Sequence, residues 1–567
     1  MNPLTRLLIL HGIIRWRLNW DKRDTHYAFT VPGNPKFMGS RDAAKLIHDG
    51  DAIAFSGLGG NQHATIMYWA IREVFEETGH PRDLTVMVVG GMGGRGIVPG
   101  TIDELGQEGL CARFITGHHE TYKNMLRLGQ EGKAEVQCIP QGTISLLFEA
   151  QTRGEESVLI DTGVGTMVDP RIGRGTPIAG EGAEQMVAVE GDKLRYRLPK
   201  INVAIFNAPA ADREGNIYMK GCPMIAEVPE ITRAAKRNNG IVIANVLSVV
   251  DKGCDDVFFP ADLIDAVVLY PPVGKRSLKP GARYAPIFAT DSEMSPDQGY
   301  EAIRYINRVL GVTPRRSKVE DAVARLAATT LVRNAPKGAF VNIGTGMPEE
   351  VCRNIYLARL IDDVTFFTES GVIGGIPCPG VLFGAAICPK EMISSAEVFR
   401  KAHESLDVTV LGILQVDSDG NVNVSKRGEG PLRYVGPGGF IDFSTSAKMV
   451  IFIGSWAAHS KAKVVGNGIS IVKPGKPKFV DKVDEITFSG EQALKAGTKV
   501  FYATNVGLFR LTERGVELTR VMPGIDIQKD ILDVSPMRIV VPESGDVPVV
   551  EEPIVTGKGF SLRFKND

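Results

Sequence analysis

The stretch Val364-Thr-Phe-Phe-Thr-Glu-Ser-Gly-Val-Ile-Gly-Gly375 is an apolar run that ends in a glycine-rich turn. A second stretch of the same kind, Leu84-Thr-Val-Met-Val-Val-Gly-Gly-Met-Gly-Gly94, lies in the first half of the chain. Short apolar runs bounded by turn signals are typical of strands that are buried on both faces, as in parallel sheets. The pair therefore predicts one buried strand followed by a turn in each half of the chain.

Two further pairs of segments occur in the same order. Residues 51–60 and residues 338–346 each run from apolar residues into a G-x-G turn. The segment Asp212-Arg-Glu-Gly-Asn216 has a counterpart in Asp417-Ser-Asp-Gly-Asn421. Self-similarity in a fixed order indicates an internal duplication. We therefore expect two homologous open α/β domains with mostly parallel sheets.

The boundaries of these domains follow from composition. Residues 271–316 are rich in proline and charge and carry no long apolar run, so we place the joint there. Residues 1–36 are Arg-rich and contain an apolar run that is too short to span a bilayer. They are predicted to be an N-terminal extension, with an organellar presequence as the alternative. The predicted domains are then 37–310 and 311–567.

Strand-like and helical segments alternate along both halves, which favours open parallel sheets. Ligands in such sheets bind beyond the carboxyl ends of the strands, where the glycine turns fall. The predicted strands include residues 85–89, 241–244, 408–411 and 449–453, and the predicted helices include residues 65–77, 319–331 and 348–360.

Composition restricts the function classes. The formal net charge of −1 over 567 residues gives no basic surplus for nucleic acid, and no segment is long and apolar enough for a membrane span. The seven cysteines are scattered and form no C-x-x-C pair, which indicates reduced thiols and a cytoplasmic protein. Adjacent side chains such as His118 and His119 point apart, so no metal site is predicted.

The most informative residue is Glu369, a carboxylate at the end of a predicted strand. The aligned residue in the first half is Val89, so the repeat is kept while the carboxylate occurs in one copy only. Capping a helix or pairing with a surface lysine would not need this difference, whereas a nucleophile would. We interpret Glu369 as a functional residue.

The segment Glu369-Ser-Gly-Val-Ile-Gly-Gly375 resembles the active-site motif E-x-G-x-x-G-G of family I coenzyme A transferases. The similarity is greatest to the single-chain branch of propionate, acetate and acetoacyl CoA-transferases, and it extends from about residue 37 to the C-terminus. Other segments similar to this family are Pro140-Gln-Gly142, residues 163–171, the two D-x-[ED]-G-N turns, and residues 436–442, 507–515 and 523–526.

The resemblance implies a covalent, ping-pong transfer of coenzyme A between acyl-CoA and short-chain carboxylic acids. Glu369 would attack the acyl-CoA carbonyl, and the resulting anhydride would react with CoA to give a glutamyl-CoA thioester. No metal and no tightly bound cofactor are expected, because CoA is itself the substrate and the covalent intermediate. We also expect a homo-oligomer, the common form of soluble enzymes.

Backbone N–H groups in glycine turns are suited to stabilise the developing oxyanion. The candidates are the amides around Gly346 and Met347, and those of Gly438 or Gly439, with ordinary strand-to-helix turns as the alternative. Lys461 is a candidate for binding the phosphates of CoA, or else a solvated surface lysine. Further CoA contacts are predicted at Gly344, Gly371 and Gln141.

Other interpretations remain open from the sequence. The glycine-rich residues 90–96 look like a dinucleotide loop, but their alignment with the Glu369 turn favours a role at the entrance for the acyl group or CoA. An acyl-CoA hydrolase on the same scaffold would use water as the final acceptor. A non-catalytic sensor of CoA esters or sugar phosphates is the third possibility.

Overall fold

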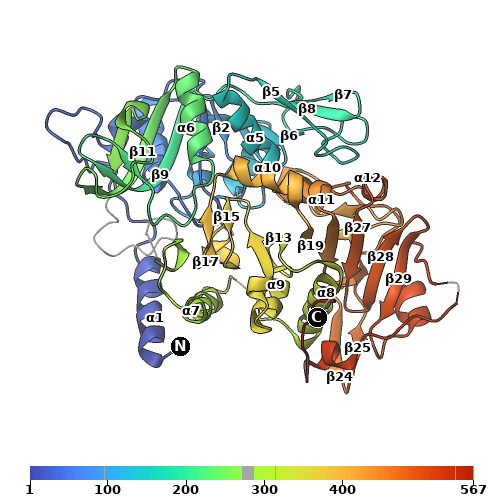
Figure 1. Ribbon diagram of the computed structural model, residues 1–567. Coiled ribbons are helices and arrows are strands. Elements are labelled where there is room, and N and C mark those ends of the chain that lie inside the picture. Colours follow the sequence, from blue (N-terminus) through green and yellow to red (C-terminus); the bar gives the residue numbers. More distant parts are fainter. Residues whose placement is uncertain (95, 97, 271–285, 313–314, 543, 566–567) are drawn as a thin grey trace.

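Two nine-stranded sheets, one in each half of the chain, form the framework of the molecule (Figure 1). The computed structural model describes residues 1–94, 96, 98–270, 286–312, 315–542 and 544–565. In Figure 1 the first-half sheet, coloured blue to green, lies above the second-half sheet, coloured yellow to red.

The first sheet has the strand order β12-β11-β9-β1-β2-β3-β4-β6, with β10 paired to β9. Its strands are mostly parallel, and antiparallel pairing is confined to β10 and to β6 at the edge. The strand bounds are β1 (Ala52–Phe55), β2 (Leu84–Met87), β3 (Cys111–Thr116), β4 (Glu135–Cys138), β6 (Pro177–Ala179), β9 (Val203–Asp212), β10 (Ile217–Tyr218), β11 (Ile241–Val250) and β12 (Ala266–Leu269).

The second sheet has the order β18-β15-β14-β13-β19-β22-β27-β28-β29. Its central strands are parallel, whereas β15 and β18 at one edge and β28 and β29 at the other are antiparallel. The strand bounds are β13 (Ala339–Ile343), β14 (Val364–Phe367), β15 (Val372–Ile373), β18 (Glu391–Met392), β19 (Val408–Gly412), β22 (Met449–Ile453), β27 (Lys499–Ala503), β28 (Gly507–Thr512) and β29 (Gly515–Val521).

The two sheets share a five-stranded parallel unit. The order β12-β11-β9-β1-β2 of the first sheet corresponds to β27-β22-β19-β13-β14 of the second, and all neighbours in both series are parallel. The predicted fold class, two α/β units with mostly parallel sheets, is confirmed. The halves diverge after β2 and β14, where the first continues with parallel strands and the second with short antiparallel ones.

The third pair of repeated segments forms the same turn twice. Asp212 Oδ1 accepts a hydrogen bond from the backbone N–H of Asn216 at 3.1 Å, and Asp417 Oδ1 accepts one from Asn421 at 3.0 Å. The side-chain amides of the two asparagines donate to the other carboxylate oxygens, at 2.8 and 3.2 Å. Short polar side chains that bond to nearby backbone in this way stabilise tight turns.

Helices from both halves pack between the sheets: α5 contacts α6, α10 and α11, and α10 contacts α11 (Figure 1). One hydrophobic cluster continues through both halves, and a second fills the far face of the first sheet. The main helices are α3 (Thr65–Thr78), α4 (Lys123–Gln130), α5 (Gln141–Thr152), α6 (Val228–Arg237), α8 (Lys318–Asn334), α9 (Glu349–Leu357), α10 (Ser395–Ser405) and α11 (Phe440–Ser446).

Smaller elements complete the fold. They are the three-stranded sheet β5 (Ser157–Ile160), β8 (Lys193–Arg197) and β7 (Val187–Glu190), the hairpin β24 (Lys461–Val465) and β25 (Gly468–Lys473), the pairs β16 (Ile376–Pro377) with β17 (Ala386–Ile387), β20 (Gln415–Val416) with β21 (Val422–Asn423) and β23 (Ala457–Ala458) with β26 (Lys476–Pro477), and the short helices α2 (Ser40–Ala44), α12 (Gly490–Lys495) and α13 (Glu552–Thr556).

The region between the halves contains a helix that the sequence analysis did not predict. Within the proposed joint, residues 271–285 lie outside the described residues, but α7 (Pro296–Val309) follows them. Its buried side chains include Tyr300, Ile303 and Asn307, a helical spacing that the surrounding prolines and charges concealed. The predicted boundary at residue 310 falls where α7 ends.

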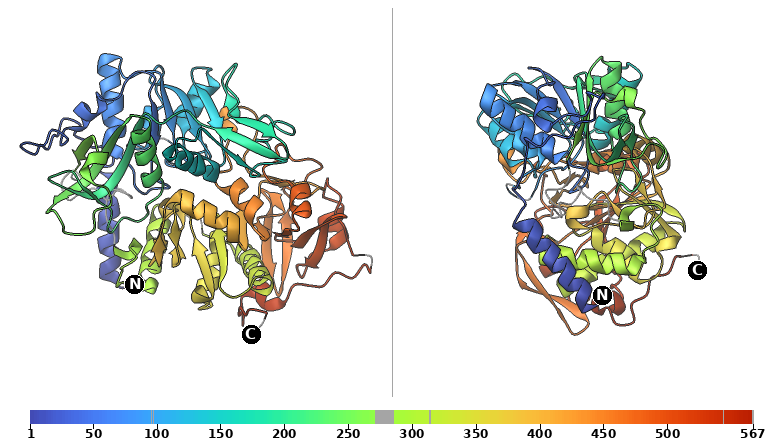
Figure 2. Two further views of the ribbon diagram at one scale, coloured as in Figure 1. Left: turned by 45° about the horizontal axis from the view of Figure 1, so that its top comes forward. Right: turned by 90° about the vertical axis from the view of Figure 1, so that its left-hand side faces the viewer.

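The N-terminal residues form a helix of their own, α1 (Pro3–Arg17), which packs against α7 (Figure 2). None of its residues is buried, and its outer side exposes apolar residues such as Leu4 and Leu7. Across the described part of the chain, every helix is too short or too polar to cross a bilayer.

Candidate active site

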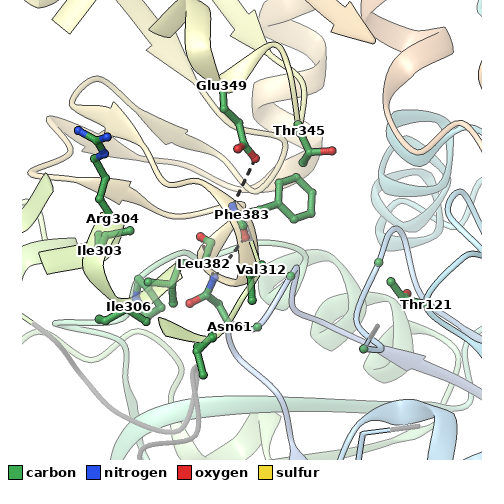
Figure 3. A pocket seen from close by; sticks show the side chains of 18 of the residues that line it. Asn61, Thr121, Ile303, Arg304, Ile306, Val312, Thr345, Glu349, Leu382 and Phe383 are labelled. Carbon is green, nitrogen blue, oxygen red and sulfur yellow. Dashed lines mark hydrogen bonds between the residues drawn. The ribbon is translucent and has the colours of Figure 1, made fainter. Parts of the chain in front are cut away.

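A cleft of about 2790 Å³ is lined by residues of both halves (Figure 3 shows part of it). The first half contributes residues such as Gly91, His118 and Gln141, and the second half contributes Glu369 and the glycine turns of residues 344–346 and 436–439. The cleft therefore brings together segments that the sequence analysis had selected separately from the two halves.

Glu369 follows β14 directly, in a tight turn at the carboxyl end of the strand. The turn is closed by two backbone bonds, from the Gly371 N–H to the Thr368 carbonyl at 3.1 Å and from the Thr368 N–H to the Val372 carbonyl at 3.0 Å. Gly371 has φ +86°, and a Cβ there would lie 1.9 Å from the Ile393 carbonyl oxygen. Only glycine fits, so Gly371 shapes the turn, and it is not among the described residues that line the cleft.

Glu369 is 8% exposed and lines the cleft. Burial raises its pKa to about 7, because removing a charge from water disfavours the ionised form. In the equivalent turn of the first half, Val89 is fully buried in the hydrophobic core. The duplicated framework therefore holds an apolar residue in one copy and a carboxylate with a raised pKa in the other.

The turn 436–439 lies beside Glu369, and the amides of its last two residues, Gly438 and Gly439, differ in their availability. The Gly438 N–H donates to the Gly117 carbonyl at 2.7 Å, and the Gly438 carbonyl accepts from the Gln141 N–H at 3.0 Å. Gly438 is therefore used to join the two halves. A Cβ on Gly439 would lie 3.4 Å from Cγ of Glu369, which leaves Gly439 as the candidate oxyanion donor of the pair.

The second candidate turn, residues 344–347, also borders the cleft near Glu369. Gly344 and Gly346 line it, and Gly344 donates to the Val410 carbonyl at 2.9 Å. Burial raises the pKa of the Glu349 carboxyl, and the nearby amide of Gly346 offsets part of that rise. Met347 packs against the core and is not among the described residues that line the cleft.

Gln141 begins α5 and lines the cleft opposite Gly438. Its side-chain Nε2 is buried and has no hydrogen-bond partner among the described residues. The start of α5 is held from the other half, because Asp442 accepts from the N–H groups of Gly142 and Thr143, both at 3.0 Å. An unsatisfied buried donor is costly, so Nε2 is a group to which a substrate can bind.

The proposed phosphate ligand Lys461 lies elsewhere. It is exposed on the β24–β25 hairpin, which packs against α8 and α13, and it is not among the described residues that line the cleft. Figure 1 shows the hairpin at the bottom of the second half. A contact between Lys461 and CoA therefore stays a prediction that the lining of the cleft does not support.

Several cleft residues were not predicted from the sequence, among them Glu349 and Phe383. His118 also lines the cleft, whereas Nε2 of the buried His119 is 3.1 Å from the Gln137 carbonyl, so the two rings point apart as expected. The described glycines of residues 90–96 include Gly91, Gly93 and Gly94, which line the cleft, and their role at the entrance for the acyl group or CoA stays a prediction.

Comparisons with known proteins agree with this site. Residues 38–269 match the protein family described as Coenzyme A transferase. A caffeate CoA-transferase from Acetobacterium woodii is 33% identical over 512 residues, which is 88% of this chain and 93% of that protein. The acetate CoA-transferase YdiF from Escherichia coli K12 is 30% identical over 516 residues, 89% of this chain and 92% of that protein.

A solved structure shares the whole architecture. The acyl-CoA transferase YdiF from E. coli O157:H7, in a thioester complex with CoA, superimposes with a TM-score of 0.80 at 28% identity, covering 93% of this chain and 97% of that one. Similarity of this extent in sequence and in structure establishes the family. This chain is a CoA-transferase and belongs to the family I coenzyme A transferases.

Proposed function

We propose that the protein transfers coenzyme A between an acyl-CoA and a carboxylic acid through a glutamyl-CoA thioester on Glu369. The observation that carries this proposal is the placement of Glu369, a buried carboxylate at a strand end that faces a large cleft and lies beside the Gly439 turn. The proposed acids are short-chain acids such as acetate or propionate, in line with the name of the E. coli relative.

The reaction needs only carboxylate, thioester and thiolate chemistry. An oxygen of Glu369 attacks the thioester carbonyl carbon, and the C–S bond breaks. CoA thiolate departs, and the acyl group remains bound to Glu369 as an acyl–glutamyl anhydride. The thiolate then attacks the glutamyl carbonyl carbon, and the first acid leaves as a carboxylate. A second carboxylate attacks the glutamyl thioester, and the same steps in reverse regenerate Glu369 and release the new acyl-CoA.

A carboxylate is a weak nucleophile, so its attack on a thioester needs stabilisation of the oxyanion and binding energy from the substrate. Both tetrahedral intermediates carry an oxyanion, and the proposed donor to it is the amide of Gly439, a residue that lies next to the Glu369 side chain. One donor of this kind typically contributes about 3 kcal/mol to the transition state. The long non-reacting part of CoA can fill the large cleft, and its binding energy can be used at the reacting centre.

The first prediction tests the covalent intermediate directly. Incubation with acyl-CoA in the absence of an acceptor acid should add the mass of CoA minus water to the peptide that contains Glu369. Glu369→Gln should form no adduct and reduce exchange to background. Glu391→Gln, which changes an exposed carboxylate on β18, is the matched control and should behave as wild type.

Three outcomes would contradict the proposal. They are an adduct on another residue, exchange retained by Glu369→Gln, and thioester consumption that proceeds undiminished without an acceptor acid. The last result would show water as the acceptor and therefore a hydrolase.

A further inference from the structure

A second carboxylate, Glu349, lies close to the proposed nucleophile. It is the first residue of α9, and Pro348 alone separates it from the turn 344–347. Glu349 and Glu369 both line the large cleft, and both also line a small recess of about 20 Å³. A space of this size holds about one water molecule, so it accepts only a small group without rearrangement.

The recess offers no positive charge. Besides the two carboxylates, its lining includes Thr345, Cys352, Cys378 and Phe383, and none of its described lining residues is basic. In Figure 3 the carboxylate of Glu349 points toward the segment of Leu382 and Phe383, with Thr345 beside it.

Glu349 is held in this position by backbone donors. The Gly380 N–H donates to Glu349 Oε1 at 3.3 Å, and the amide of Gly346 also approaches the carboxylate. Burial nevertheless raises the pKa of Glu349, because these donors and Arg316 offset desolvation only in part. Arg316 lines the cleft but not the recess. Its guanidinium forms ion pairs with Glu350 at 3.3 Å and with Glu320 at 3.4 Å.

The size of CoA decides which part of the substrate enters the recess. The sulfur and the acyl substituent leave the thioester carbonyl in different directions. Only the large cleft can hold the nucleotide and pantetheine portion, which therefore occupies the open side of Glu369. The substituent of the acyl group is then directed to the other side of Glu369, where Glu349 borders both the cleft and the recess.

We propose that Glu349 is a specificity-determining residue, which makes this side of the site accept uncharged acyl groups and reject acids that carry a second carboxylate. The inference rests on the proposed role of Glu369. A dicarboxylic acid would place its distal carboxylate beside Glu349 in a weakly solvated space, where like charges repel strongly.

The test compares acids of equal size that differ in charge. Malonate and succinate are each assayed as the acceptor against their own monoamides, with the same acyl-CoA donor. The wild type should use each monoamide with a kcat/KM at least tenfold higher than that of the diacid. Glu349→Gln should narrow this ratio about tenfold, because it removes the charge at nearly constant shape.

Glu350→Gln is the matched control, because the neighbouring carboxylate pairs with Arg316 and Arg353 and lines neither space. It should lose stability and keep the wild-type ratio. Equal use of diacid and monoamide by the wild type would overturn the proposal even if Glu349→Gln does not fold, and so would an unchanged ratio in a folded Glu349→Gln.

The glutamyl-CoA adduct, measured in the same proteins, separates this inference from the proposed function. An adduct on Glu369 together with an unchanged ratio refutes the role of Glu349 alone. Failure of the wild type to form the adduct refutes the mechanism on which the inference rests.

Discussion

At the scale of the residue, Glu369 combines two opposed requirements. Its attack on a thioester needs the ionised carboxylate, yet its burial favours the neutral carboxyl and raises its pKa to about 7. The unfolded chain holds this group near the ordinary value of 4.5. The ionised nucleophile therefore lowers the stability of the fold, a cost that is typical of functional carboxylates in apolar surroundings.

This cost gives a prediction with a definite sign. Because the pKa is higher in the folded state, folding takes up a proton between about pH 4.5 and 7, and stability falls as the pH rises through that window. Between pH 5 and pH 8, the ionisation of Glu369 should lower the free energy of unfolding of the wild type by about 2–3 kcal/mol. Glu369→Gln does not titrate at this position. Its free energy of unfolding should therefore rise by that amount relative to the wild type over the same pH interval.

Urea unfolding of both proteins at the two pH values measures this difference, with Glu391→Gln as the exposed control. If the free energies of unfolding of wild type and Glu369→Gln differ equally at both pH values, the raised pKa of Glu369 is contradicted. If Glu369→Gln is favoured more at pH 5 than at pH 8, the pKa of Glu369 is lowered and not raised.

The sequence was sufficient to select Glu369 as the candidate nucleophile but not to choose among its neighbours. Comparison with Val89 identified the carboxylate, because a duplicated framework makes a single changed residue visible. The choice between Gly438 and Gly439 depends on Gly117, which comes from the other half and occupies the Gly438 amide. Glu349 was missed because an acidic residue in the first turn of a helix is ordinary, favoured there by the helix dipole.

At the scale of the element, the site is built at the ends of helices and strands that contact each other across the halves. Asp442 is the clearest link. It lies in α11, three residues after Gly439, and its carboxylate accepts from the amides of Gly142 and Thr143 in the first turn of α5, the helix that begins at Gln141. It is 2% exposed, and burial raises its pKa to about 7 despite these backbone donors.

Removing this link should affect both stability and catalysis. Asp442→Ala leaves the amides of Gly142 and Thr143 without their acceptor and should destabilise the protein by about 3 kcal/mol. Gln141 and Gly439 then lose their fixed separation, so kcat should fall more than KM rises. Denaturant unfolding and steady-state kinetics measure the two effects.

Two milder variants calibrate this result. Thr143→Ala removes only the hydroxyl bond of 3.3 Å to Asp442 and should cost about 1 kcal/mol. Asp442→Asn keeps one acceptor oxygen and should recover part of kcat. A folded Asp442→Ala with wild-type kcat would show that the link holds the helices without positioning the site.

Elements with strong periodic patterns could be predicted from the sequence, and weakly patterned ones could not. The run 449–453 is β22 to the residue, and the helical spacing from Val319 predicted α8. The two-residue strands β15 and β18 carry no period of their own, because their pairing is set by the turn after Glu369. Predicted domain boundaries depend on linker composition, which concealed α7.

At the scale of the whole molecule, the two halves are joined through the site itself. The Ala226 N–H donates to the Ser370 carbonyl at 3.2 Å, next to Glu369, and the Gln141 N–H donates to the Gly438 carbonyl at 3.0 Å. Each half therefore fixes a turn of the other. The duplication could be read from the repeats, but these contacts could not, because they join residues that differ between the copies.

The N-terminal helix α1 stands apart from this arrangement and allows a last prediction. None of its residues is buried, so deletion of residues 2–18 should leave the fold and the Glu369–CoA adduct intact, with a melting temperature lower by a few degrees at most. Trp16 and Arg17 line the cleft, however, so the KM for acyl-CoA should rise while kcat is kept.

Two point variants separate the cleft-facing side of α1 from its outer side. Trp16→Ala should reproduce the higher KM, whereas Leu7→Ala should not, because Leu7 is 62% exposed and is not among the described residues that line the cleft. Loss of the adduct on deletion would show that α1 belongs to the catalytic unit. An unchanged KM in both the deletion and Trp16→Ala would show that bound CoA does not contact the side of α1 that lines the cleft.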